Sequence, residues 1–160
     1  LFKRYRIMKT YLREQIILNI SKNFKKNFFI YGEDKKNIGL NLLSSQYDKK
    51  EIKRIYEGNI CIDTGPIPGS LSLHPRSIQI LESNGLLMQA KQNDFSEVWG
   101  DLNEKIIFSN IENLLIGIDL MLSDQEKYNE YLSLIYEKFK NSDYKIYETL
   151  KKAFPDRKEN

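Results

Sequence analysis

The stretch ICIDTGPIPGSLSLHPRSIQILESNGLLM, residues 60–88, decides the fold. It begins and ends with short apolar runs, at residues 60–62 and 86–88. Between them stand Pro75, a residue suited to the first turn of a helix, and Asn84-Gly85, which suits a helix end. The order of these signals predicts a strand, a helix and a second strand.

The segment between the first strand and the helix cannot be regular secondary structure. Residues 65–69 contain two glycines and two prolines, which predicts a loop leaving the carboxyl end of the strand. In open parallel sheets, ligands bind outside the carboxyl ends of the strands. The loop is therefore the first place to look for a site.

Outside this stretch, helical and strand patterns alternate. The expected strands are residues 28–31, which stop at Gly32, and residues 106–108, while residues 33–46 read as polar and irregular. Helices are expected at 4–22, after Asp48, over 75–83, after Asn110, after Ser123 and near 143–153.

Caps and apolar stripes support these helices. Asp48 with Glu51, and Ser123 with Glu126, have the spacing of capping boxes. Each helix has an apolar face that is expected to point into the core. In the first helix these residues are Tyr5, Met8, Leu12, Ile16 and Ile20. In the helix after Asn110 they are Leu114, Leu115, Ile118 and Leu122, and in the helix after Ser123 they are Tyr128, Tyr131, Leu132, Ile135 and Phe139.

Because several strands are continuous apolar runs, both faces of the sheet should be covered. The pattern predicts an α/β fold with a Rossmann-like parallel sheet flanked by helices and a helical C-terminal end. We expect one domain over residues 1–155 and a frayed tail over 156–160.

Charge and rare residues narrow the function. Residues 1–57 carry 14 Lys/Arg and 6 Asp/Glu, a net charge of +8, whereas residues 58–160 carry a net charge of −5. A basic half suits an anionic ligand or a membrane surface, or is simply a solvated face. Cys61 is the sole cysteine and His74 the sole histidine, so neither a disulfide within the chain nor a multi-histidine metal site is possible. Cys61 lies in an apolar run and is expected to be a buried structural thiol.

The start of the helix at Pro75 is suited to phosphate. A helix N-terminus presents free N–H groups and partial positive charge. Gly69 and Ser70 allow close backbone approach, and Arg76 is placed to bind two phosphate oxygens. The alternatives are a solvated Arg76 and glycines that only shape the loop. His74 and Asp63 could touch a ligand, or could cap local structure.

Residues 76–88, RSIQILESNGLLM, resemble the R-x-F-E-x-x-A-x-G-G-x-L-L segment of group 1 glycosyltransferase C-terminal domains, especially the spore-maturation-protein-like branch. The order of strands and helices over residues 24–154 agrees with that family. The resemblance implies a bacterial GT-B glycosyltransferase of glycan or cell-surface polysaccharide biosynthesis, whose donor-binding half is this chain and whose N-terminal domain is absent from it.

The candidate residues for binding a nucleotide-diphosphate sugar are Gly32, Gly69, Ser70, Ser72, His74, Arg76 and Gln79. Gly32 follows the first expected strand, and Gly69 and Ser70 belong to the loop, so these three are expected at the carboxyl ends of the strands. By motif position, the resemblance places Ser72, Leu73 and His74 where the family's backbone approaches the phosphate and the sugar. Arg76 would contact the diphosphate, and Gln79 stands where the family usually has a ribose-binding glutamate. Glu82 could take that role only in a register that needs a gap. No metal or other cofactor is required, and the catalytic residues are unknown because the acceptor and general base would belong to the facing domain.

The remaining expectations concern binding partners and cellular location. The acceptor would be a glycan or a lipid-linked molecule, and we expect no nucleic-acid partner because the lysines are scattered and lack an aromatic platform. Without a signal peptide or a membrane-spanning run, the protein is expected in the cytoplasm, with the inner membrane surface as an alternative. The competing interpretation is a non-catalytic Rossmann-like ligand- or protein-interaction domain, which the uncharged Gln79 favours.

Overall fold

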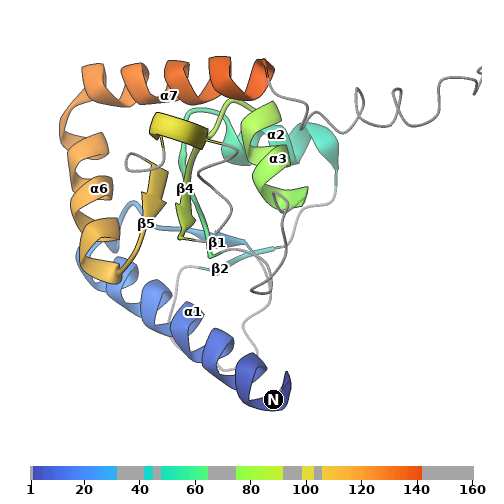
Figure 1. Ribbon diagram of the computed structural model, residues 1–160, viewed down its shortest axis with the longest axis vertical. Helices are drawn as coiled ribbons and strands as arrows, with labels where there is room; N and C mark the ends of the chain where they lie inside the picture. The colour runs from blue at the N-terminus through green and yellow to red at the C-terminus, as the bar shows by residue number, and fades with distance from the viewer. Residues whose placement is uncertain are drawn as a thin grey trace, which may run out of the picture. The chain divides into compact units, whose positions relative to one another are not determined.

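The predicted strand–helix–strand unit is confirmed in the computed structural model of the chain (Figure 1). Strand β3 (Ile60–Asp63) is followed by helix α3 (Pro75–Glu82) and strand β4 (Leu86–Ala90). After α3 the chain turns through Asn84, whose φ of 58° is left-handed. Asparagine tolerates this conformation better than most residues, which explains why the helix ends here.

The structure describes residues 2–31, 42–44, 48–64, 75–91, 99–102 and 106–141. The chain divides into two compact units, Leu1–Glu51 and Ile52–Asn160, which are described separately below. The expected helix near 143–153 and the tail at 156–160 lie outside the described residues.

The C-terminal unit contains a parallel sheet. Its described strands have the order β3-β4-β5, with β5 at Ile107–Phe108, so β4 is central and successive strands are neighbours. The remaining elements are the short 3₁₀ helix η1 (Gly100–Leu102) and the helices α6 (Ile111–Ser123) and α7 (Gln125–Lys140). The described chain is thus mixed α/β with a small parallel sheet flanked by helices, as the sequence predicts, and is compatible with a Rossmann-like fold.

Helices pack on both faces of this sheet. In the parallel register, Cys61 lies opposite Leu87 and Asp63 lies opposite Gln89, so these four side chains share one face. The polar pair on that face bonds to α3, and α7 contacts both β4 and α3. On the other face, α6 lies so close to Met88 that a Cβ on Gly117 would come 2.6 Å from the Met88 Cε.

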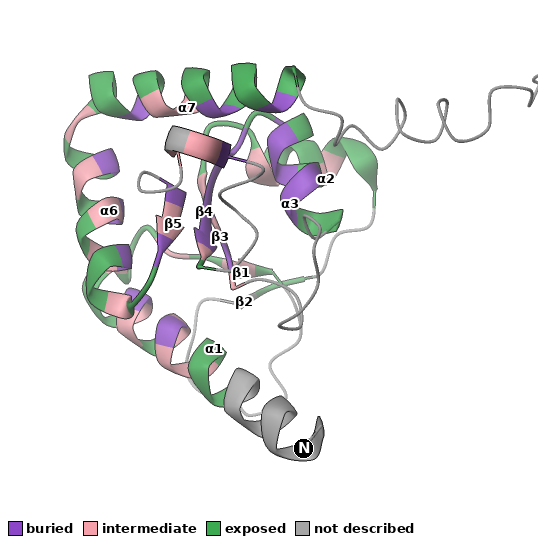
Figure 2. Ribbon diagram, in the orientation of Figure 1, coloured by how far each residue is buried: buried purple, intermediate pink, exposed green. Residues whose placement is uncertain are grey.

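The core lies between the sheet and the helices α3 and α7, where Figure 2 shows the buried sides of both helices turned inward. Tyr56, Leu102 and Ile107 pack against this core from its rim. The core cluster consists of Cys61, Ile78, Ile80, Leu81, Leu87, Trp99, Ile106, Ile135 and Phe139. Trp99 and η1 were not anticipated from the sequence, because nothing between residues 92 and 102 has a clear period.

The N-terminal unit contains helix α1 (Phe2–Phe24) and two parallel strands, β1 (Ile30–Tyr31) and β2 (Leu42–Leu43). In α1, Ile16 and Ile20 are buried as expected, whereas Leu12 is 49% exposed, so its assignment to the inward stripe is wrong. The side chains of Tyr5 and Met8 lie outside the described residues.

Strand β2 contradicts the expectation that residues 33–46 are irregular throughout. Ile30 pairs with Leu42 and Tyr31 with Leu43. The two-residue strand is too short for alternation to reveal it, and each of its residues pairs with one twelve positions earlier in the chain. The rest of the segment from 33 to 41 lies outside the described residues.

The helix caps are confirmed in two cases and corrected in a third. Asp48 begins helix α2 (Lys49–Tyr56), its Oδ1 accepting from the N–H groups of Lys50 (2.9 Å) and Glu51 (3.2 Å). Asn110 begins α6, its Oδ1 accepting from the N–H of Asn113 (2.8 Å). Gly58, with φ of 70°, follows the end of α2.

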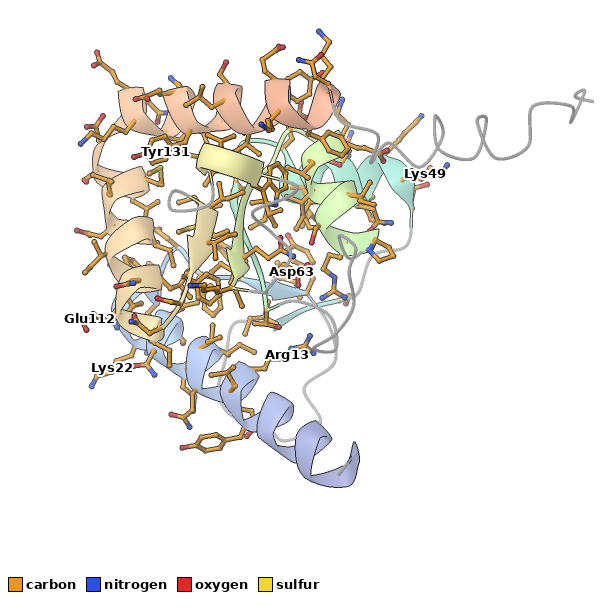
Figure 3. The ribbon with its side chains drawn as sticks, viewed as in Figure 1. Arg13, Lys22, Lys49, Asp63, Glu112 and Tyr131 are labelled. Atoms are coloured by element: carbon orange, nitrogen blue, oxygen red, sulfur yellow. The ribbon has the colours of Figure 1, made fainter. Side chains whose placement is uncertain are left out.

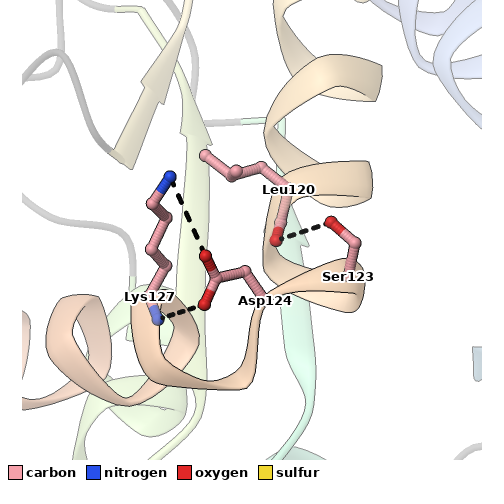
Figure 4. A network of polar contacts seen from close by, with 4 residues as sticks. All are labelled: Leu120, Ser123, Asp124 and Lys127. Atoms are coloured by element: carbon pink, nitrogen blue, oxygen red, sulfur yellow. Dashed lines mark hydrogen bonds and ion pairs between the residues drawn. The ribbon is translucent and has the colours of Figure 1, made fainter.

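The predicted capping box from Ser123 to Glu126 is wrong, because Asp124 is the cap of α7 (Figure 4). Its Oδ1 accepts from the Lys127 N–H at 3.0 Å, and its Oδ2 lies 3.8 Å from the Lys127 Nζ. Ser123 still belongs to α6, where its hydroxyl donates to the Leu120 carbonyl oxygen at 3.3 Å. A carboxylate at a helix N-terminus also interacts favourably with the helix dipole, which a serine hydroxyl does not match.

The predicted stripe of α6 also needs one correction. Leu114 and Ile118 are buried, but Leu122 is 52% exposed and Met121 is buried in its place. In α7, Tyr128, Ile135 and Phe139 are buried as predicted, while Tyr131 and Leu132 are half-buried.

Candidate functional site at the carboxyl edge of the sheet

The parallel pairing brings the ends of two strands to the start of one helix. Asp63 is the last residue of β3, and its register partner Gln89 is the second-last residue of β4. Helix α3 begins at Pro75, and its third residue, Ser77, faces both of them. Because the strands are parallel, all three residues meet at the carboxyl edge of the sheet.

These three residues form a buried hydrogen-bonded cluster, which we call the edge cluster: Asp63, Ser77 and Gln89. The Ser77 hydroxyl donates to the Asp63 Oδ2 at 2.5 Å, and the Gln89 Nε2 donates to the Ser77 Oγ at 3.3 Å. Asp63 is 5% exposed, and Ser77 and Gln89 are fully buried. The short distance to the carboxylate is typical of a charge-assisted hydrogen bond, which is among the stronger hydrogen bonds in proteins.

Figure 3 shows Asp63 in the interior, between the strands and α3, while Glu112 at the start of α6 points outward. A buried carboxylate costs free energy unless hydrogen bonds compensate it. Asp63 has a further interaction besides the bond from Ser77. The edge cluster therefore ties the end of β3 and the end of β4 to the first turn of α3.

Arg76 and Gln79 lie on the outer face of α3. Both are exposed, and they are three positions apart in the sequence, which places them on the same side of the helix about one turn apart. Ser77 and Gln79 are two residues apart and so point to opposite sides, which explains why one is buried and the other is not. Arg76 takes part in an interaction with its surroundings.

Tyr56, at the end of α2, faces the same region. Burial raises the pKa of Tyr56, and the nearby Arg76 guanidinium acts in the opposite direction. The charge of the Asp63 carboxylate raises that pKa as well. Near neutral pH the phenol is therefore uncharged.

Cys61 is a structural residue, as predicted. Burial raises the pKa of the Cys61 thiol to about 12, so it stays protonated near neutral pH. Its Sγ lies 3.8 Å from the Tyr56 carbonyl oxygen and 3.5 Å from that of Asn59. A buried, protonated thiol is a poor nucleophile and a poor metal ligand.

Of the predicted ligand-binding residues, the structure describes Arg76 and Gln79 and places them together on α3. The other five lie outside the described residues: Gly32, Gly69, Ser70, Ser72 and His74. Leu73, which the resemblance places beside Ser72 and His74, lies outside them too.

Sequence reasoning missed Ser77 and Gln89. Ser77 precedes Ile80 by three residues and Leu81 by four, a spacing that puts it on the buried stripe of the helix. Gln89 continues the apolar run of β4, where its alternation with Met88 puts it on the face of Leu87. Both signals were present, but they indicate a buried position and not a partner.

The described residues contain no group of three or more His, Cys, Asp and Glu side chains placed to hold a metal ion. Within the same residues, no helix is both long and apolar enough to cross a membrane.

Comparison with known proteins identifies no relative: no family, no curated protein and no solved structure matches the chain.

Proposed function

We propose that the C-terminal unit is the donor-binding half of a GT-B glycosyltransferase and binds a nucleotide-diphosphate sugar at the start of α3. The observation that carries the proposal is the position of Arg76, in the first turn of a helix that follows β3 at the carboxyl edge of a parallel sheet. This is where open α/β sheets bind their ligands. The motif of residues 76–88 supports the same assignment.

The electrostatics favour an anion at this place. The first turn of a helix carries partial positive charge, and an exposed arginine adds a full charge that the helix dipole alone would disfavour. An anion between the dipole and the guanidinium removes that conflict and receives hydrogen bonds from both. A diphosphate leaving group stabilised in this manner needs no metal ion.

Gln79 supplies the second contact in the proposal. It lies one helical turn beyond Arg76 on the same exposed face, so a nucleotide whose diphosphate contacts Arg76 can place its ribose near the Gln79 amide. The amide both donates and accepts, which suits ribose hydroxyls, although it lacks the charge of a glutamate. The acceptor, the general base and the transfer step are assigned to a facing domain.

Two features favour a second candidate, a non-catalytic ligand- or protein-interaction domain. Gln79 is uncharged, and the buried Asp63 puts a negative charge beneath the proposed phosphate site. Two negative charges repel each other, and they do so more strongly inside a protein than in water. Arg76 offsets this repulsion, but the balance makes the affinity for phosphates the quantity to measure.

Calorimetric titration with uridine diphosphate and with guanosine diphosphate tests the proposal. We expect binding that weakens by roughly 10- to 100-fold in Arg76→Ala, because a hydrogen bond to a charged group contributes about 1.5–3 kcal/mol. The matched control is Arg54→Ala. Arg54 is exposed on α2, and it points away from the side that carries Tyr56, two residues later.

The titration separates the two candidates. Binding that is lost in Arg76→Ala and kept in Arg54→Ala supports donor binding. Absence of binding at millimolar nucleotide, or equal affinity in both variants, contradicts it and favours the interaction domain.

A further inference from the structure

The carbonyl oxygen of the Gln89 side chain is a buried acceptor whose partner is missing. The side chain is fully buried, and among the described residues nothing donates a hydrogen bond to its Oε1. Trp99 Nε1 and Tyr128 Oη are also buried without a hydrogen-bond partner among the described residues, but neither belongs to the edge cluster. A buried polar atom without a partner costs about 1–3 kcal/mol, so a partner from outside the described chain is expected.

The orientation of the Gln89 amide is determined by its neighbours. Ser77 has one hydroxyl hydrogen, which it donates to the Asp63 Oδ2 at 2.5 Å. Its Oγ can therefore only accept from Gln89, and the atom at 3.3 Å must be the Nε2 and not the Oε1. A flipped amide would place two acceptors against each other, so Oε1 is the end left to face another group.

The location of Oε1 identifies the kind of group that it can bind. It shares an amide carbon with the Nε2 that bonds Ser77, so it lies at the first turn of α3, where the proposed function places the phosphates. Phosphate oxygens are acceptors and cannot pair with a carbonyl oxygen. In a nucleotide sugar, the groups joined to the diphosphate are the ribose and the transferred sugar, and both carry hydroxyl donors.

We infer that Gln89 is a specificity-determining residue, whose Oε1 accepts a hydrogen bond from a hydroxyl group of the sugar or ribose next to the bound diphosphate. The inference rests on the proposed function. Because Oε1 is buried, a ligand that lacks the hydroxyl leaves the acceptor unpaired, and sites of this kind discriminate strongly against such a ligand. The edge cluster then has a second role: Asp63 and Ser77 orient the amide that recognises the ligand.

The test compares Gln89→Met with the wild type in titrations with uridine and guanosine diphosphates and with uridine diphosphate glucose and guanosine diphosphate mannose. Methionine has a similar volume and no carbonyl oxygen. We expect an affinity loss of about five- to tenfold, the usual contribution of one hydrogen bond. A loss seen already with the diphosphates assigns the bond to the ribose, and a loss confined to the nucleotide sugars assigns it to the transferred sugar.

Ser77→Ala is the matched control, since it removes the partner of Nε2 and leaves Oε1 in place. Because Ser77 also orients the amide, this variant should lose part of the affinity, and Gln89→Met should lose at least as much. A Gln89→Met variant that keeps the wild-type affinity for every ligand, or that loses less than Ser77→Ala, overturns the inference. Should Gln89→Met fail to fold, the ¹³Cδ and side-chain ¹⁵N resonances of Gln89 in the wild type decide: a shift at saturating ligand supports the bond, and unchanged resonances refute it.

Failure of the inference is distinguishable from failure of the proposed function. If no nucleotide binds, or Arg76→Ala binds as the wild type does, both are refuted. If Arg76→Ala loses binding while Gln89→Met retains the affinity of the wild type, donor binding is supported and the proposed role of Gln89 is refuted.

Discussion

Replacing Ser77 with alanine is the sharpest test of the edge cluster. The substitution removes one oxygen from the interior and breaks both hydrogen bonds of the cluster, the one to Asp63 and the one from Gln89. Asp63 and Gln89 stay buried, with exposures of 5% and 0%, so water does not readily replace the lost hydroxyl.

The expected cost follows from these two bonds. A hydrogen bond to a charged group contributes about 1.5–3 kcal/mol, and a neutral one about 0.5–1.5 kcal/mol. The bond to the carboxylate is short, while the 3.3 Å bond from Gln89 lies at the weak end of its range. Asp63 keeps another interaction, which reduces the penalty. We therefore expect Ser77→Ala to lower the free energy of unfolding by about 2–4 kcal/mol.

Equilibrium unfolding in urea, followed by circular dichroism, measures this cost. For small proteins the free energy falls by about 1–3 kcal/mol per molar urea, so the midpoint should move by roughly 1–2 M. The matched control is Ser83→Ala. Ser83 is 7% exposed just after the same helix, and its backbone N–H, which alanine retains, bonds to Gln79 and Ile80.

The two serine variants decide between a bonded cluster and ordinary packing. If Ser77→Ala and Ser83→Ala unfold within about 0.5 kcal/mol of each other, the edge cluster contributes no special stability. The orientation argued for the Gln89 amide would then lose its physical basis, since that orientation depends on the Ser77 hydroxyl being committed to Asp63.

Three further predictions concern the fold. Gly85→Ala should destabilise the protein by about 1–3 kcal/mol in thermal denaturation, because its Cβ would lie 2.8 Å from a backbone carbonyl oxygen. Gly117→Ala should be close to neutral, because its Cβ meets only the flexible end of a methionine, and equal losses in the two variants would contradict this. Burial raises the pKa of Cys61 from 9.0 to about 12, so the folded state holds this proton more tightly than the unfolded state. Stability from this group is complete below pH 9 and falls by about 1.4 kcal/mol per unit between pH 9 and 12, a slope that Cys61→Ala should reduce in urea titrations at each pH. Asp124→Ala should lower the free energy of unfolding by about 1 kcal/mol, and Asp124→Asn should lower it by only a few tenths of a kcal/mol. The midpoints of urea unfolding measure both changes. Equal effects would show that the cap does not depend on a side-chain oxygen.

The sequence predicted the strand–helix–strand unit well because its signals are local. Apolar runs, Pro75 and the Asn84-Gly85 turn each act within a few residues of one another, and the structure places every one of these elements where expected. Capping was predicted less well: Ser123 and Asp124 are adjacent and both can cap, and only the geometry shows that Asp124 does so.

The site was harder to predict because its bonds span long distances in the chain. Ser77 lies 14 positions after Asp63 and 12 positions before Gln89 in the sequence. The helical period indicates that Ser77 is buried, and strand alternation indicates the same for Gln89, but the parallel register alone shows that they meet. Arg76 and Gln79 were found for the opposite reason, since neighbours one helical turn apart can be read from spacing.

The edge cluster interrupts an otherwise apolar face. Cys61 and Leu87 occupy this face of the sheet, and two residues further along each strand the chain places Asp63 and Gln89. Apolar residues of similar volume at such positions are often neutral or stabilising, so stability alone does not account for a buried carboxylate and amide. Register could account for them, because a one-residue slip would separate Asp63 and Gln89 from Ser77. The two hydrogen bonds of Ser77 are enough to fix the register, however, so this explanation does not account for the unpaired Gln89 Oε1. Ligand recognition explains that atom as well, and so the affinity of Gln89→Met, and not its stability, is the measurement that separates the two explanations.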